Sequence, residues 1–241
     1  MPTHVHVRET ANCQAGGAPT WIDSSAHDWL ARATVVLVFS LLVFASVSGA
    51  LQIALDSGHQ PLDRTLLQIA ARASNALFLA LVAATAVTRL RPLRKAAGIE
   101  PRLSALLGTF LLISLAVLPR AELPPIAVAI SSVLVIVGLS ASFMVLRWLG
   151  KSFSIMAEAR GLVTQGPYAL VRHPLYICEE IAVIGLFIQV MSPVAFLIVM
   201  VHALFQFRRM LNEEKVLKAT FGEYESYAAR TPRLIPLGRF G

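Results

Sequence analysis

The sequence predicts an all-α, polytopic integral membrane protein with about six transmembrane helices. Of its 241 residues, 56% are hydrophobic and only 15% are charged, whereas a typical soluble domain has about 25% charged residues. Long apolar segments also recur along the chain, and a bilayer-crossing helix needs about 20 such residues. The basic residues are distributed asymmetrically between the connecting segments, as membrane topology requires. The net charge of +7 therefore indicates topology, and we expect no nucleic-acid partner.

Six apolar segments account for the predicted transmembrane helices. The last two are separated only by Ser192 and Pro193, so they are expected to form a tight helical hairpin over residues 174–207. The segments are residues 33–55, 66–88, 103–118, 123–146, 174–191 and 194–207.

The connecting segments predict the orientation in the membrane. With six spans, both termini lie on one side. Of the 21 lysines and arginines, all but Arg64, Arg72 and Arg120 fall on that side or at its helix ends. Because cytoplasmic loops carry the excess of basic residues, both termini are predicted to be cytoplasmic. Short loops and six spans favour a bacterial inner-membrane protein.

The chain divides into three regions. Residues 1–28 are polar and do not have the form of a signal peptide, so they are expected to form a cytoplasmic tail. Residues 29–146 are predicted to form a four-span scaffold. Residues 147–241 hold most of the chemically informative polar groups, and the two cysteines of the chain offer no metal-binding spacing.

One polar cluster opens the fifth segment, in the stretch GPYALVRHPLYICEE. Gly-Pro predicts a turn, and the proline after His173 suits the first turn of a helix. Arg172 and His173 would then stand at a helix N-terminus, which favours an anion. Helical spacing places Arg172, Tyr176 and Glu179 on one face. A simpler alternative is that the glutamates pair with arginines at the membrane interface, and we favour it for Glu180.

A second polar cluster follows the sixth segment, in RRMLNEEKVLKATFGEYESYAARTPRLIPL. Its spacing predicts a cytoplasmic helix that ends near Gly222, a residue type common at helix C-termini. Glu213 and Glu214 flank the apolar stripe of this helix. Spacing alone equally supports surface glutamates that pair with Lys215 and Lys218.

These two clusters together carry a family pattern. GLVTQGPYALVRHPLYICEE followed by NEEKVLKATFGEYESYAARTPRLIP resembles the isoprenylcysteine carboxyl methyltransferase and phospholipid N-methyltransferase superfamily. The shared elements are Gly-Pro-Tyr, Arg-His-Pro-x-Tyr-x-x-Glu, an apolar hairpin, Glu-Glu-x-x-Leu, Phe-Gly-x-Tyr-x-x-Tyr and Arg-x-x-Pro, over roughly residues 147–237. One departure is Cys178, where family members often have glycine.

The resemblance implies a methyltransferase that uses S-adenosyl-L-methionine without a Rossmann domain. The cofactor pocket would lie between the cytoplasmic ends of the last spans and the C-terminal helix. Arg147 and Arg233 look like acceptor-side residues, and either could hold the carboxylate or phosphate of an acceptor. An amine acceptor must first lose a proton, which Glu179 or Glu180 could accept, and Glu179 is the catalytic candidate because it matches the family pattern. The implied cofactor-binding residues are Gly166, Tyr168, Arg172, His173, Tyr176, Glu213 and Glu214. His202 and Gln206 could also line the site, although a lone histidine in a span more often bonds between helices.

The acceptor is left open by the sequence. The resemblance implies a membrane lipid or a prenylated acceptor, and it favours carboxyl methylation of an isoprenylcysteine-type substrate. Phospholipid amine or thiol methylation remains an alternative. Related sterol or enone reductases of membranes share Arg-His-Pro-x-Tyr and bind NADPH, but the Glu-Glu pair and the Phe-Gly-x-Tyr element favour methyl transfer. A non-enzymatic scaffold is the third possibility, and the sequence does not determine the oligomeric state.

Overall fold

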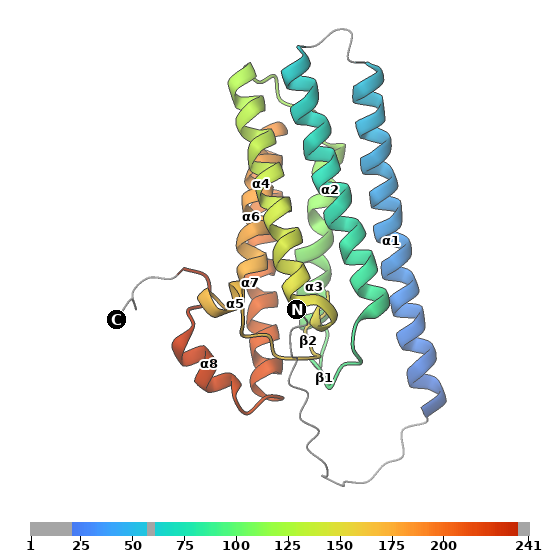
Figure 1. Cartoon of the computed structure of the whole chain (residues 1–241), viewed down its shortest axis with the longest axis vertical. Coiled ribbons are helices and arrows are strands. Elements are labelled where there is room, and N and C mark those ends of the chain that lie inside the picture. The colour runs from blue at the N-terminus through green and yellow to red at the C-terminus, as the bar shows by residue number, and fades with distance from the viewer. Residues whose placement is uncertain (1–20, 57–60, 236–241) are drawn as a thin grey trace.

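A computed structural model describes residues 21–56 and 61–235. Its helices run side by side as an elongated bundle, with α5, α8 and a small β-ribbon at one end (Figure 1). The helices are α1 (Trp21–Leu55), α2 (Leu62–Thr88), α3 (Glu100–Phe110), α4 (Pro125–Leu149), α5 (Pro167–Leu170), α6 (Pro174–Gln189), α7 (Pro193–Lys218) and α8 (Tyr224–Arg230), with 3₁₀ helices η2 (Leu111–Val117) and η3 (Gly150–Ser152).

The bundle is that of an integral membrane protein, as predicted. Within the described residues, five helical stretches are long and apolar enough to cross a bilayer: 32–55, 62–88, 100–117, 125–152 and 193–218. The predicted fifth segment is α6, which is shorter at 16 residues. Most of the predicted N-terminal tail, together with Cys13, lies outside the described residues, and α1 already begins at Trp21.

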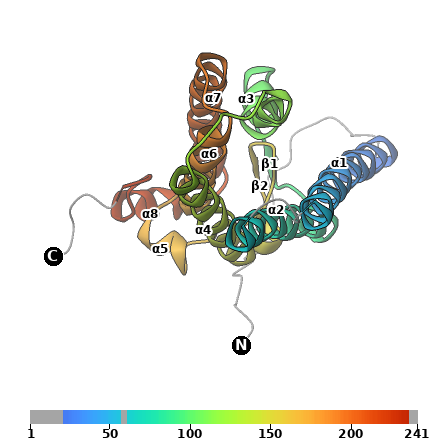
Figure 2. The ribbon, with the colours of Figure 1, turned by 90° about the horizontal axis from the view of Figure 1, so that it is seen from above.

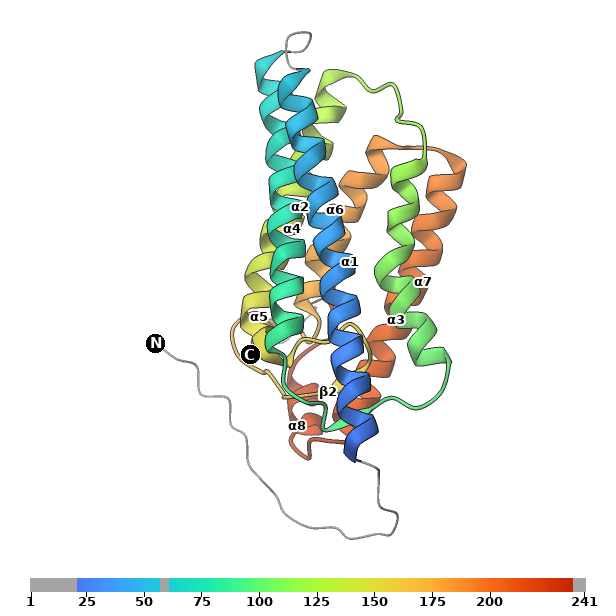
Figure 3. The same ribbon diagram turned by 90° about the vertical axis from the view of Figure 1, so that its right-hand side faces the viewer.

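The helices follow one another around an arc. Seen from above, α1, α2, α4, α6 and α7 lie in turn along it, and α3 stands beside α7 (Figure 2). Figure 3 shows α3 and α7 on one side of the bundle and α1, α2 and α4 on the other. The chain therefore builds a curved wall, and the packing of α3 against α7 joins an early segment to the C-terminal region.

The predicted hairpin forms, but its two helices pack mainly against other partners. Ser192 caps α7 by accepting a hydrogen bond from the backbone N–H of Ala195 at 3.1 Å. α6 packs mostly on α4 and α7 mostly on α3. Gly138 lets α4 and α6 approach closely: a Cβ at this position would lie only 2.5 Å from the backbone nitrogen of Ala182.

Three details differ from the sequence-based prediction. The expected cytoplasmic helix is the last part of α7, which runs unbroken from the membrane segment to Lys218 and ends before Gly222. α8 and the ribbon of β1 (Arg94–Lys95) and β2 (Glu158–Ala159) were not predicted. The antiparallel ribbon pairs Arg94 with Ala159, and two-residue strands are too short to show a period in the sequence.

Candidate active site

A polar cavity lies at the end of the bundle that carries α8. It encloses about 810 Å³ of empty space, including its mouth, and is lined by residues from α4 through α8 and from the segment 152–163. Of the residues predicted for the site, the lining includes Tyr168, Arg172, His173, Tyr176, Glu179 and Glu213.

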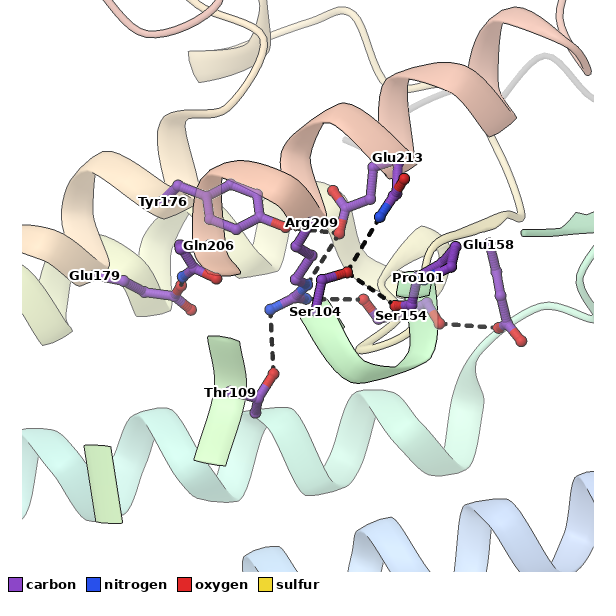
Figure 4. Close-up of polar contacts among 11 residues, drawn as sticks. Pro101, Ser104, Thr109, Ser154, Glu158, Tyr176, Glu179, Gln206, Arg209 and Glu213 are labelled. Atoms are coloured by element: carbon purple, nitrogen blue, oxygen red, sulfur yellow. Dashed lines mark hydrogen bonds and ion pairs between the residues drawn. The ribbon is translucent and has the colours of Figure 1, made fainter. Parts of the chain in front are cut away.

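Arg209 of α7 lies at the centre of the polar contacts in this region (Figure 4). It is 6% exposed and donates from Nε to Glu213 Oε1 at 3.2 Å. Its two terminal nitrogens donate to Thr109 Oγ1 at 3.2 Å and to the carbonyl of Ser154 at 3.3 Å. The guanidinium also lies 5.3 Å from the ring centroid of Tyr176, within the range of a cation–π contact. Arg209 thus joins α3, α6, α7 and the segment after α4.

Glu213 connects α6 to α7 at the same place. The hydroxyl of Tyr176 donates to Glu213 Oε1 at 2.6 Å, and the ring of Tyr176 meets the His173 ring edge-on with centroids 5.4 Å apart. Because Glu213 lines the cavity and its partners come from within the protein, the alternative of a solvated surface glutamate does not hold for this residue.

Glu214 faces a different environment from its neighbour. It is 8% exposed, and Arg233 binds its carboxylate with a fork, Nε to Oε1 at 2.9 Å and Nη2 to Oε2 at 2.8 Å. His173 Nε2 lies 3.0 Å and Arg172 Nη1 3.3 Å from Oε1. The suggested surface pair with Lys218 is wrong, since that lysine pairs with Glu225 at 2.7 Å.

This cluster around Glu214 fastens the C-terminal segment over the Arg-His motif. The backbone N–H groups of Arg172 and His173 donate to the carbonyls of Pro232 and Arg233 at 2.9 and 3.2 Å. Nearby, the Tyr227 hydroxyl donates to the carbonyl of Tyr168 at 2.7 Å, and burial raises the pKa of Tyr227. Neither Glu214 nor Arg233 lines the polar cavity. Both therefore stabilise the wall of the cavity from behind and do not face its interior.

Two other predicted residues also lie outside the cavity lining. Gly166 begins the turn into α5 with φ of 60°, and a Cβ there would lie 2.7 Å from the indole of Trp148. It therefore shapes the turn that presents Tyr168. Arg147, at the end of α4, is exposed and lines neither this cavity nor the second one.

A second, mostly apolar cavity lies inside the bundle. Together with its open mouth it holds about 1,100 Å³ of empty space, and it is lined by residues of α1, α2, α3, α4, α6 and α7, among them Phe39, Phe78 and Leu186. Phe153, Glu179 and Arg209 line both cavities. These three residues therefore mark the junction between a polar compartment and an apolar one.

Sequence reasoning missed Arg209, Thr109 and Ser154. Arg209 was counted only as a basic residue of the membrane interface, because the adjacent Arg208 is a surface residue and the pair looks like a topology signal. Its spacing of four residues from Glu213 is the one sequence signal that could have singled it out. Thr109 lies 100 residues from Arg209, and no local pattern connects the two.

Comparison with known families identifies the C-terminal part of the chain. Residues 122–224 match the model of the phospholipid methyltransferase family. The match covers 103 of the 241 residues, and this family is part of the integral membrane methyltransferase superfamily that the sequence resembles. The resemblance stated from the sequence is thereby confirmed for these residues, which include every residue of the junction between the cavities.

Two curated relatives are similar over a short stretch. The nickel-cobalt-cadmium resistance protein NccN of Alcaligenes xylosoxydans xylosoxydans is 37% identical over 76 residues, which are 31% of this chain and 36% of the relative. The cobalt-zinc-cadmium resistance protein CzcN of Cupriavidus metallidurans is 38% identical over 76 residues, 31% of this chain and 35% of the relative. The chain thus matches only about a third of the length of either relative.

Proposed function

We propose that this protein is an S-adenosyl-L-methionine-dependent methyltransferase that acts at the membrane on a lipid-like or isoprenylated acceptor. The observation that carries the proposal is the junction between the two cavities. Glu179 and Arg209 line both the polar compartment and the apolar one. A polar cofactor and an apolar acceptor that occupied the two compartments would meet at these residues.

The side chains of the polar cavity fit the cofactor chemically. S-adenosyl-L-methionine carries a carboxylate, an ammonium group, ribose hydroxyls and a sulfonium cation. Arg172 suits the carboxylate, and the carboxylates of Glu213 and Glu158 suit the ammonium group or the hydroxyls. The aromatic ring of Tyr176 and the carboxylate of Glu179 favour a cation close to the junction. When bound, the cofactor supplies a methyl group on an already activated sulfonium.

The residues of the protein then have mainly to position the reactants and exclude water. Arg209 and Tyr176 brace the junction, and Phe153 provides apolar surface on both sides of it. The role of Glu179 depends on the acceptor. A carboxylate is already anionic and requires no base, whereas an amine or thiol loses a proton, which Glu179 would accept at a carboxylate oxygen.

The acceptor that the resemblance favours is an isoprenylcysteine-type carboxylate. The apolar cavity supports any acceptor with a long hydrocarbon portion, because its lining is dominated by apolar side chains. A phospholipid amine or a thiol on a lipid-like molecule fits the same space. The start of α1 and α8 lie at the same end of the bundle (Figure 1), which supports both termini on one side of the membrane. We infer that this side is cytoplasmic, from the excess of basic residues in its segments, and that the membrane is a bacterial inner membrane.

Isothermal titration calorimetry with S-adenosylhomocysteine and NADPH tests this proposal on the full chain in nanodiscs. We expect binding of S-adenosylhomocysteine and none of NADPH. Binding of NADPH alone would overturn the proposal in favour of a reductase, and binding of neither would favour a scaffold.

A methyl-transfer assay with radiolabelled cofactor then identifies the acceptor class. It compares isoprenylcysteine carboxylates, phospholipid amines and lipid thiols. For an amine or thiol acceptor, Glu179→Gln should lower turnover about 100-fold, the usual contribution of a general base. Glu225→Gln serves as the control, since this exposed carboxylate pairs with Lys218 at the surface and does not line either cavity. With a carboxylate acceptor, Glu179→Gln should leave turnover within a few fold.

A further inference from the structure

α6 and α7 are joined by a ladder of polar contacts that continues from the polar cavity into the apolar one. Its first contact joins Tyr176 to Glu213. The second joins Gln206 Nε2 to Glu179 Oε2 at 3.0 Å, and the third joins His202 Nε2 to Glu180 Oε1 at 3.2 Å. Along α7 the members His202, Gln206 and Glu213 lie four and seven residues apart, so they share one helical face.

The second and third contacts leave buried polar atoms without a partner. Gln206 is 3% exposed and His202 is 2% exposed. Gln206 Oε1 and His202 Nδ1 have no hydrogen-bond partner among the described residues and are almost fully shielded. Both residues line the apolar cavity, and a donor in the cavity reaches the two atoms only when their side chains shift toward it. An unpaired buried polar group costs about 1–3 kcal/mol, so two such atoms at one wall of a cavity point to a ligand that satisfies them.

The neighbouring carboxylates determine which role each unpaired atom has. The carboxylate of Glu179 can only accept, so the Gln206 amide must turn its nitrogen toward it and its oxygen away. In the tautomer in which His202 Nε2 donates to the carboxylate of Glu180, Nδ1 is left as an acceptor. Both free atoms are therefore hydrogen-bond acceptors that require a donor.

We propose that Gln206 Oε1 and His202 Nδ1 form a subsite inside the apolar cavity that binds N–H or O–H donors of the methyl acceptor. This inference rests on the proposed function for the identity of the ligand as the acceptor. Gln206 is bonded to Glu179 at the junction, and His202 lies one helical turn further along α7, a rise of about 6 Å. The acceptor thus carries a donor group within about one helical turn of the atom that is methylated, rather than a plain hydrocarbon chain.

A pair of uncharged probes tests the subsite without the need for a known acceptor. N-dodecylacetamide has one N–H donor, and N-dodecyl-N-methylacetamide lacks it but keeps the chain and the carbonyl. Apparent affinity is measured on the full chain in nanodiscs, from the rise of Tm with the mole fraction of each probe. We expect the N–H probe to bind about threefold to tenfold more tightly, the value of one neutral hydrogen bond.

Two variants and one control locate the effect. Gln206→Met and His202→Leu, each tested alone, should reduce or abolish the preference for the N–H probe. Asn75→Leu is the control: Asn75 lines the same cavity from α2 but donates to Ser46 Oγ at 2.7 Å, so the preference should survive. If one of the first two variants fails to fold, the other variant and the comparison of the two probes on wild type still test the subsite.

The inference is overturned if wild type binds the two probes equally, or if the preference persists in the double variant Gln206→Met/His202→Leu, because each single variant keeps one of the two acceptors. Binding of S-adenosylhomocysteine to the same preparation is measured separately. Cofactor binding without a probe preference would overturn only the subsite. A probe preference without cofactor binding would overturn the proposed function and leave the subsite as a ligand site of another kind.

Discussion

Replacing Arg209 with methionine should destabilise the protein more than the same replacement of any exposed arginine. The change removes the charged partner of Glu213, the contacts to Thr109 and to the Ser154 carbonyl and the stacking on Tyr176. A hydrogen bond to a charged group contributes about 1.5–3 kcal/mol and a desolvated cation–π contact about 2 kcal/mol. One such hydrogen bond and the cation–π contact together account for about 3.5–5 kcal/mol, close to the ~3–5 kcal/mol cost of breaking a buried ion pair. The three hydrogen bonds are not added in full, because contacts of one residue are not independent.

The assay is thermal unfolding of the cofactor-free protein in nanodiscs, followed by circular dichroism. For a chain of this size, 1 kcal/mol corresponds to about 2–4 °C in Tm, so Arg209→Met should lower Tm by about 10 °C. The control is Arg208→Met on the adjacent residue, because Arg208 pairs with Glu100 at 3.1 Å with both side chains about half exposed. Exposed ion pairs contribute at most about 1 kcal/mol, which predicts a shift of no more than a few degrees.

A double variant separates the loss of the ion pair from the loss of packing. In Arg209→Met, the carboxylate of Glu213 remains partly buried without its cation. Adding Glu213→Gln removes that charge and should recover about 2 kcal/mol, within the range of coupling energies between contacting residues. The central role of Arg209 is refuted if Arg209→Met lowers Tm no more than Arg208→Met does. It is also refuted if Glu213→Gln lowers the stability of Arg209→Met as much as it lowers that of wild type.

Three further outcomes are expected. Glu214→Ala should weaken S-adenosylhomocysteine binding at least tenfold, because the cluster that holds the C-terminal segment is lost, whereas Glu225→Gln, at an exposed surface pair, should not. Equal calorimetric affinities would show that this cluster does not support cofactor binding. Gly166→Ala should lower Tm by several degrees because its φ is positive and the space beside it is filled, whereas Gly222→Ala, with nothing within 4 Å of an added Cβ, should change little. Burial raises the pKa of Tyr227, so the protonated hydroxyl contributes fully to the stability of the fold below pH ~10, the pKa of free tyrosine, and this contribution is lost as the pH rises through the folded-state pKa. The free energy of unfolding should therefore fall less steeply with alkaline pH in Tyr227→Phe than in wild type. An equal slope in the two proteins would contradict this.

The sequence by itself determined the class of protein and the local geometry at the mouth of α6. Segment length and apolar composition predict helices in a membrane because a bilayer can be crossed only by chains whose backbone groups are bonded internally. Gly166 and Pro174 act locally, through a positive φ and a missing N–H, so the turn and the helix start could be predicted from residue type. The order of the motif elements likewise indicated the family.

The tertiary structure alone decided what each polar side chain contacts. Glu213 and Glu214 are adjacent and look equivalent in the sequence, yet one turns toward Tyr176 and Arg209 and the other toward Arg233 and the Arg-His motif. One residue of an α-helix rotates a side chain by about 100°, so neighbours meet different parts of the chain. The partners of Arg209 come from segments up to 100 residues away, brought together by the packing of α3 against α7, which no local pattern specifies.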